Sequence, residues 1–110
     1  TTDDVRREGL PAVLEAIRRR VGTGPVFLTF DIDFVDPSFA PGTGTPEVGG
    51  FTSREAQELV RGLVGIDFVG MDLVEVLPAH DPSGITALIA ANVIFEFLSV
   101  LAVNRRERAR

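Results

Sequence analysis

The chain has 110 residues, enough for one small domain or part of a larger one, and it contains no cysteine, which excludes a disulfide framework and thiolate chemistry. Its formal net charge of −5 argues against a nucleic-acid surface, and because all eleven basic residues are arginine, no mechanism can use a lysine from this chain. Hydrophobic residues make up 45% and charged residues 25%, as in soluble globular domains, and without cysteine we expect a reducing, cytoplasmic compartment.

The first part of the chain predicts one helix and one strand. Residues 1–9 are polar and carry no signal-peptide pattern, and because the chain begins with threonine we expect it to be part of a longer protein. Residues 10–21 have apolar side chains at helical spacing and a cluster of arginines in the last turn, where the helix dipole favours cations. After a Gly-Thr-Gly break, residues 25–30 predict a short buried strand.

The remaining elements alternate in the same way. Residues 51–65 predict a second amphipathic helix, in which Thr52 and Glu55 have the spacing of a capping box. Residues 67–76 predict a second strand. A loop then leads to a long apolar helix at residues 85–103.

That last helix is nearly long enough to span a bilayer. Asn92, Glu96 and Ser99 interrupt its apolar sequence, which is unfavourable inside a membrane. We therefore expect no membrane span, but a helix buried against a sheet or a neighbouring subunit. The charged residues 104–110 would form a solvated tail.

The order helix–strand–helix–strand–helix indicates an α/β fold with parallel strands, because each helix has the length of a crossover connection. Two strands make a small sheet for this much apolar helix and strand. We therefore expect further strands beside them, and the sequence predicts part of a larger domain.

Three carboxylates, Asp31, Asp33 and Asp36, end the first predicted strand. Within a strand, Asp31 and Asp33 would point to the same side, and at an effective dielectric near 20 their charges would repel by about 2–3 kcal/mol. A bound cation, a bridging water or a raised pKa would relieve that repulsion. Carboxyl ends of parallel strands are also where α/β folds place their ligands. Three interpretations stay open: a metal site, aspartates that cap the following turn, and an aspartyl nucleophile.

Two named alternatives can be compared by spacing. An EF-hand loop needs an oxygen ligand at its fifth position and glycine at its sixth, but Val35 and Asp36 occupy these positions, which excludes an EF-hand. A hydrolase of the haloacid dehalogenase type also has Asp-x-Asp after an apolar strand. It usually continues with Thr or Val and uses a lysine, whereas Phe34 follows here and the chain has no lysine, so this interpretation is weak.

The segment TFDIDFVDPSFAPGTGTPEVGG resembles a signature of the ureohydrolase family, the arginases and agmatinases. Its form is closer to the agmatinases and guanidinobutyrases than to the arginases proper. The segments GMDLVEVLPAHD and ITALIAANVIFEFLSVLA also resemble the family's glutamate-bearing strand and closing helix. The residues that match the signature are Thr29, Phe30, Asp31, Ile32, Asp33, Pro37, Pro41, Gly42 and Gly50.

The resemblance implies a three-layer α-β-α sandwich with a parallel sheet and two manganese ions at its carboxyl edge. The residue matching Asp31 would bridge both ions and the one matching Asp33 would bind one of them. Glu75 matches the glutamate that binds the guanidinium of the substrate. Thr45 would offer a hydroxyl near the substrate or pack the loop, and Asp36 would shape the turn.

The implied activity is hydrolysis of a small guanidino compound, agmatine or similar, to urea and an amine by a homo-oligomer. The family's other ligands lie in upstream histidine motifs that do not occur here, so residues 1–110 are expected to be the C-terminal portion of one catalytic domain. The one histidine, His80, is expected to be an exposed loop residue. The Pro-Ser-Gly at residues 82–84 departs from the family's His-Ala-Glu and leaves the substrate open. The alternative is a non-catalytic remnant or interaction module with an incomplete metal site.

Overall fold

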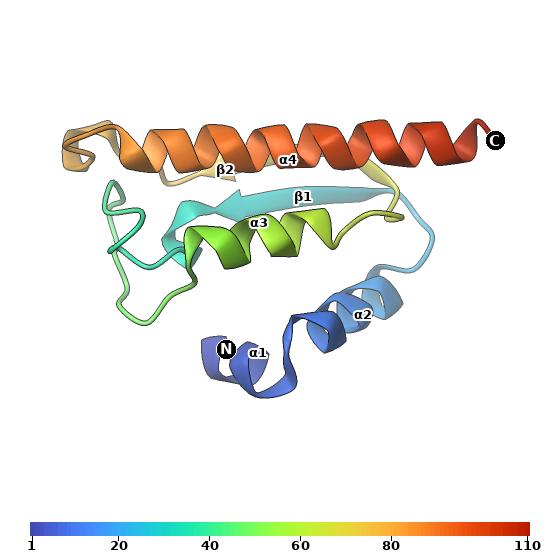
Figure 1. Ribbon diagram of the computed structural model, residues 1–110, viewed down its shortest axis with the longest axis horizontal. Helices are drawn as coiled ribbons and strands as arrows, with labels where there is room; N and C mark the ends of the chain where they lie inside the picture. Colours follow the sequence, from blue (N-terminus) through green and yellow to red (C-terminus); the bar gives the residue numbers. More distant parts are fainter.

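The computed structural model describes residues 1–110 and contains two parallel strands flanked by helices (Figure 1). Strand β1 spans Val26–Asp31 and strand β2 spans Phe68–Val74. Their register pairs Asp31 with Val74, so both strands end at the same edge of the sheet. Figure 1 shows the long loops that follow β1 and β2 together at that edge. The predicted parallel α/β arrangement is confirmed.

The predicted helices are present. Helix α2 spans Leu10–Val21, as predicted, whereas α3, Ser53–Arg61, and α4, Ile85–Arg108, differ from the prediction at one or both ends. Helix α3 begins at the predicted capping box, in which the hydroxyl of Thr52 accepts a hydrogen bond from the Glu55 amide at 3.1 Å. It ends earlier than expected, because a series of turns leads from Arg61 to β2. Helix α4 ends later, since residues 104–108 continue the helix and do not form a separate tail.

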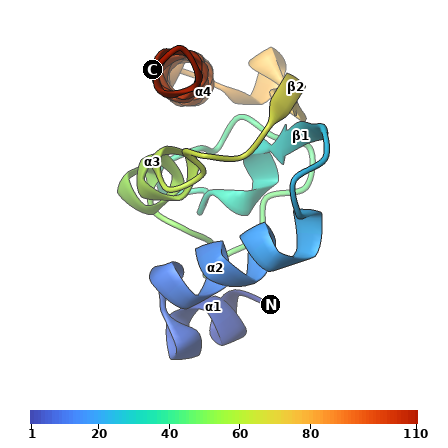
Figure 2. The ribbon, with the colours of Figure 1, turned by 90° about the vertical axis from the view of Figure 1, so that its right-hand side faces the viewer.

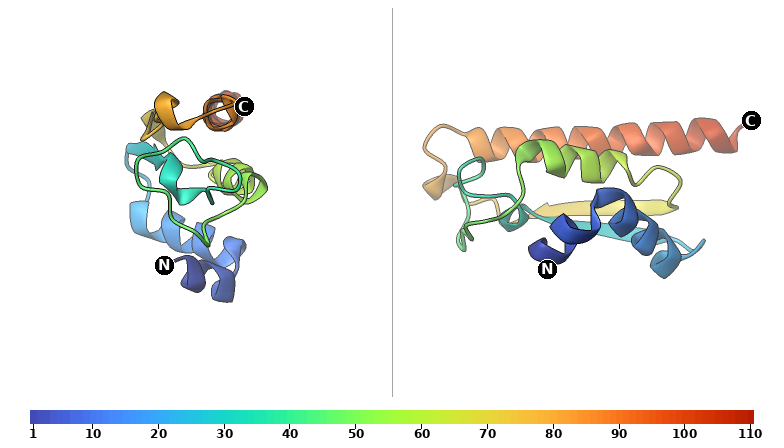
Figure 3. Two further views of the ribbon diagram at one scale, coloured as in Figure 1. Left: turned by 90° about the vertical axis from the view of Figure 1, so that its left-hand side faces the viewer. Right: turned by 60° about the horizontal axis from the view of Figure 1, so that its bottom comes forward.

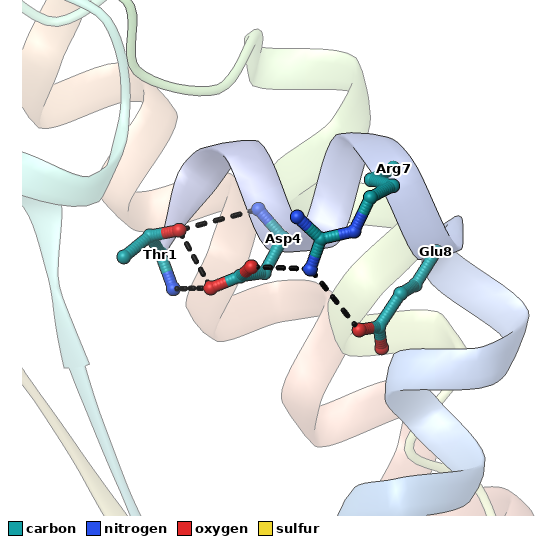
Figure 4. Close-up of polar contacts among 4 residues, drawn as sticks. All are labelled: Thr1, Asp4, Arg7 and Glu8. Atoms are coloured by element: carbon teal, nitrogen blue, oxygen red, sulfur yellow. Dashed lines mark hydrogen bonds and ion pairs between the residues drawn. The ribbon is translucent and has the colours of Figure 1, made fainter.

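A further short helix, α1, spans Thr2–Glu8 and was not predicted. Thr1 caps it: its hydroxyl accepts from the Asp4 amide at 3.2 Å and donates to the Asp4 carboxylate at 2.7 Å (Figure 4). The bonds from the Thr1 hydroxyl and Arg7 hold the pKa of Asp4 below its ordinary value. Capping and local ion pairs stabilise this helix, which buries no residue and so has no apolar periodicity to detect.

The core lies on one face of the sheet. Figures 2 and 3 show α3 and α4 together on this side of the strands, with α1 and α2 at the end of the molecule away from α4. Along β1, Phe30 is buried while Phe27 and Asp31 are exposed. Val69 in β2 is also 68% exposed. The main core cluster consists of Phe30, Ile32, Val35, Ala40, Ala56, Val60, Ala90, Val93 and Phe97.

Helix α4 packs against α3 through paired polar side chains. Gln57 donates to Asn92 at 2.6 Å, and one turn further on Arg61 binds Glu96 through two bonds of 2.8 and 2.5 Å. Two of the polar residues that interrupt the apolar sequence of α4 are thus directed at α3. The bonds from Arg61 hold the pKa of Glu96 below its ordinary value. Burial is one-sided, because Leu88, Phe95 and Leu98 are more than half exposed. By length and apolarity alone, α4 would be able to cross a bilayer.

Candidate metal and guanidinium site

Strand β1 ends at Asp31, and a single 3₁₀ turn, Ile32–Phe34, follows it. Oδ1 of Asp31 accepts a hydrogen bond from the Asp33 amide at 2.9 Å and so caps this turn. Asp33 therefore lies in the turn, and the expectation that it follows Asp31 on the same face of a strand is wrong. The capping interpretation holds for Asp31, which keeps a second carboxylate oxygen for other partners.

The turn is held in place because the residues around Asp33 are packed. Ile32 is fully buried and Val35 is 1% exposed. The ring of Phe34 stacks on that of Phe51, with centroids 4.2 Å apart and planes 8° apart. These three anchors fix the backbone on both sides of Asp33. The carboxylate of Asp33 is thus presented by a packed turn at the edge of the sheet.

The two oxygens of Asp33 have different surroundings. Oδ2 accepts a hydrogen bond from the hydroxyl of Thr45, in the loop that leads to α3. Oδ1 is buried and has no hydrogen-bond partner. A buried carboxylate oxygen without a partner loses its hydration uncompensated, and a bound cation is the ligand that would restore it. Hard carboxylate oxygens of this kind suit manganese, magnesium or calcium.

Asp36 closes the first turn of the loop. Its Oδ1 accepts from the hydroxyl and amide of Ser38 at 2.5 and 2.8 Å, and its Oδ2 accepts from the Gly49 amide at 2.8 Å. These bonds, first among them the one from the Ser38 hydroxyl, hold the pKa of Asp36 below its ordinary value. The backbone of Gly50 approaches so closely that a Cβ there would lie 2.7 Å from the Asp36 nitrogen. The predicted turn-shaping role of Asp36 is confirmed.

Glu75 follows β2 directly, one residue beyond the partner of Asp31. It is exposed, and it is the only residue other than glycine with a positive φ, at 68°. That conformation is unfavourable for a side chain with a Cβ, and such strain is found mainly at functional sites. No hydrogen bond joins Glu75 to Asp31, Asp33 or Thr45; what they share is the edge of the sheet.

The connection between β2 and α4 contacts the loop after β1. The Leu77 amide donates to the Gly42 carbonyl at 2.8 Å, and Nδ1 of His80 lies 3.1 Å from the Thr43 carbonyl. His80 is exposed, as expected for a loop histidine, but sequence reasoning missed its contact with Thr43. No pattern in the sequence indicates that contact, because 37 residues separate the two positions.

Asp81, in the same connection, caps α4. Its carboxylate accepts from the amides of Thr86 and Ala87 at 3.0 Å each. Desolvation acts to raise the pKa of Asp81, but these amide bonds outweigh it and lower the pKa. The side chain that caps α4 thus comes from Asp81, three residues before the left-handed Gly84 at the helix start.

Residues 1–110 contain no cluster of three or more histidine, cysteine, aspartate or glutamate side chains that would hold a metal ion. Asp31, Asp33 and Thr45 are linked by hydrogen bonds, and Glu75 directly follows the neighbouring strand. These side chains do not by themselves form a cluster that would hold a metal ion.

Comparison with known proteins identifies relatives of one kind. The model of the arginase family matches residues 1–99. Guanidinopropionase of Pseudomonas aeruginosa is 57% identical over 94 residues, which cover 86% of this chain and 30% of that protein.

Solved structures of similar fold agree. A hypothetical agmatinase from Burkholderia thailandensis superposes with a TM-score of 0.88 and 47% identity, over 99% of this chain and 34% of that one. Proclavaminate amidino hydrolase of Streptomyces clavuligerus gives a TM-score of 0.91 and 42% identity, over 94% of this chain and 36% of that one. The chain thus spans about a third of the length of the relatives it matches.

Proposed function

The chain belongs to the arginase family, and on that premise we propose that it is part of a manganese-dependent amidinohydrolase that converts a guanidino compound, agmatine or similar, to urea and an amine. The observation that carries the proposal is the carboxylate of Asp33, with Oδ2 held by Thr45 and Oδ1 buried without a partner. It lies at the edge of the sheet where Glu75 follows the end of the neighbouring strand. The proposal concerns the complete enzyme, of which this chain spans about a third.

The residues present fit the metal. Asp33 would bind one ion through its free oxygen, and Asp31, whose second oxygen makes no hydrogen bond within the chain, would contribute that oxygen. When bound, the ions would supply water activated at neutral pH. Since the chain gathers fewer than three ligands, further ligands would come from the rest of the enzyme.

Glu75 would bind the guanidinium group of the substrate. A guanidinium is planar and cationic, and a carboxylate pairs with it through charge-assisted, often bidentate hydrogen bonds. The positive φ of Glu75 turns the chain sharply at the end of β2, and its exposure leaves the carboxylate free for such a partner. The carboxylate of Glu75 would thereby orient the substrate carbon relative to the metal edge.

The alternative is a non-catalytic remnant or interaction module. It is favoured by the lack of a three-ligand cluster and by the exposed apolar side chains of α4, Leu88, Phe95 and Leu98. Under this alternative the Asp33 carboxylate would have no ligand to bind, and its strained neighbour Glu75 would have no substrate. The two proposals therefore differ in whether Asp33 binds metal and Glu75 binds substrate in a complete site.

A chimera tests the proposal. The matching segment of the P. aeruginosa guanidinopropionase would be replaced by this chain, and urea release from agmatine, 3-guanidinopropionate and 4-guanidinobutyrate would be measured with added manganese. We expect metal-dependent urea release from at least one substrate, abolished by Asp33→Asn. A folded chimera that binds no metal and releases no urea would support the remnant instead. The unmodified host enzyme is the positive control.

A further inference from the structure

The loop after β1 is tied to the connection after β2 by hydrogen bonds at two successive residues. The Gly42 amide donates to the hydroxyl of Thr86 at 2.8 Å, and the Gly42 carbonyl accepts from the Leu77 amide at 2.8 Å. The Thr43 carbonyl faces Nδ1 of His80 at 3.1 Å. A Cβ at position 42 would lie 2.4 Å from the Cβ of Asp81, so the two segments are in close contact.

The contact with Thr43 determines where the His80 proton must be. A backbone carbonyl only accepts hydrogen bonds, so Nδ1 of the imidazole must carry a proton to bind it. A neutral imidazole then has its lone pair on Nε2. The geometry therefore assigns the less common Nδ1–H tautomer to the neutral His80.

Thr43 is the last buried residue of the loop before Thr45, whose hydroxyl binds Asp33. It is buried, 1% exposed, whereas Gly44 and Thr45 are exposed. The only hydrogen bond of Thr45 goes from its hydroxyl to Asp33 Oδ2. The position of that hydroxyl thus depends on where the backbone is held at Thr43, two residues earlier.

We propose that His80 is a positioning residue, which holds the Thr43 carbonyl and thereby places the Thr45 hydroxyl on the Asp33 carboxylate. The proposal rests on the proposed function, in which Asp33 binds metal through its other oxygen. His80 itself touches neither metal nor substrate. Through His80, the connection that begins at Glu75 supports the Asp33 carboxylate in the turn after β1.

The tautomer can be tested directly, because His80 is the only histidine. Nitrogen-15 NMR of the chain, above the pH at which the ring is protonated, distinguishes a protonated from an unprotonated ring nitrogen. We expect the proton on Nδ1. A ring with its proton on Nε2 alone would overturn the proposal, because such a ring has no hydrogen to give to Thr43.

Two variants separate positioning from simple packing. His80→Asn keeps an N–H near the place of Nδ1, whereas His80→Gln carries its N–H near the place of Nε2. Because one hydrogen bond is lost, we expect His80→Gln to speed exchange of the Leu77 amide about 3- to 10-fold and to weaken Mn²⁺ binding by about the same factor. His80→Asn should stay within about twofold of the native chain in both. Equal behaviour of the two variants would overturn the proposal.

Thr45 completes the test. If His80 acts through Thr45, His80→Gln should weaken Mn²⁺ binding no further once Thr45→Val is present, and additive losses would contradict the proposal. A folded chimera with the P. aeruginosa enzyme that binds no Mn²⁺ would instead count against the proposed function. The His80 tautomer and the Leu77 exchange would still decide the positioning of the loop, so the two failures are distinguishable.

Discussion

The hydroxyl of Thr45 donates a hydrogen bond to Oδ2 of Asp33, twelve residues before it in the chain. The other oxygen of that carboxylate is buried and unpaired. A carboxylate that binds metal commonly has its remaining oxygen held in this way, which fixes its orientation before the ion arrives. The relationship links the Pro-, Gly- and Thr-rich loop to the acidic end of β1.

Thr45→Val should weaken Mn²⁺ binding about 10-fold, because it removes the hydrogen bond that orients Asp33 and keeps the size of the side chain. Thr45→Ser is the matched control, since it keeps the hydroxyl and should bind Mn²⁺ almost as the native chain does. Free Mn²⁺ measured by electron paramagnetic resonance during titration gives both affinities. Identical affinities for Val and Ser would show that Thr45 only packs the loop.

Glu75→Gln and Asp33→Asn should both lose activity in the chimera, but only Asp33→Asn should also lose manganese. Glu75→Gln keeps the size of the side chain but removes the charge that faces the guanidinium. We expect it to retain manganese while kcat/KM falls about 100-fold, equivalent to roughly 2.7 kcal/mol of transition-state stabilisation. Asp33→Asn should lose manganese along with activity. Metal analysis beside urea-release kinetics distinguishes the two, and loss of manganese from Glu75→Gln would assign Glu75 to the metal or to the fold.

The positive φ of Glu75 predicts a conflict between stability and function. Glycine adopts this conformation without the Cβ penalty, although it loses more chain entropy on folding, so Glu75→Gly should raise the free energy of unfolding by about 0.5–1 kcal/mol. Asp72→Gly is the control: Asp72 is an exposed residue within β2, where glycine should destabilise. Urea denaturation measures both. A less stable Glu75→Gly chain would mean that Glu75 is not strained.

The lowered pKa of Asp36 predicts how the loop responds to acid. Because the pKa is lower in the folded loop than in the unfolded chain, this carboxylate stabilises the loop above about pH 4 and ceases to do so as the pH falls through the lowered value. The Gly49 amide donates to Asp36, and its protection from exchange, measured against an unfolded amide at the same pH, should fall over that window. In Asp36→Asn this fall in protection should disappear. An unchanged pH dependence in that variant would place the transition at another group.

Sequence patterns were sufficient for the elements that pack. Apolar periodicity located α2, α3, α4 and both strands, and the Thr52–Glu55 capping box marked the start of α3. Sequence patterns failed where local polar contacts determine whether a helix forms and where it ends. Helix α1 is stabilised by Thr1 and Asp4 without burying any residue, and α4 continues into its arginine-rich end, where Arg108 binds Asp67 at 2.6 Å. Neither the capping of α1 nor the ion pair at the end of α4 produces an apolar periodicity in the sequence.

The site residues were named from the sequence, but their arrangement was not predictable. Strand alternation placed Asp31 and Asp33 on one face, whereas burial of Ile32 and Val35 ends the strand and turns the chain between them. The contact of His80 with Thr43 and the strained φ of Glu75 depend on how β2 and its loop pack beside β1. Such contacts between distant segments have no local sequence signal.

The most direct test of the account is Mn²⁺ titration of the isotope-labelled chain, followed by paramagnetic broadening of its backbone NMR signals. If Asp31 and Asp33 form one part of a metal site, the signals of Asp31, Asp33 and Thr45 should broaden first, and this selectivity should vanish in Asp33→Asn. The chain alone should release no urea from agmatine, because it gathers fewer than three ligands. Broadening spread over all exposed carboxylates, unchanged by Asp33→Asn, would contradict the account.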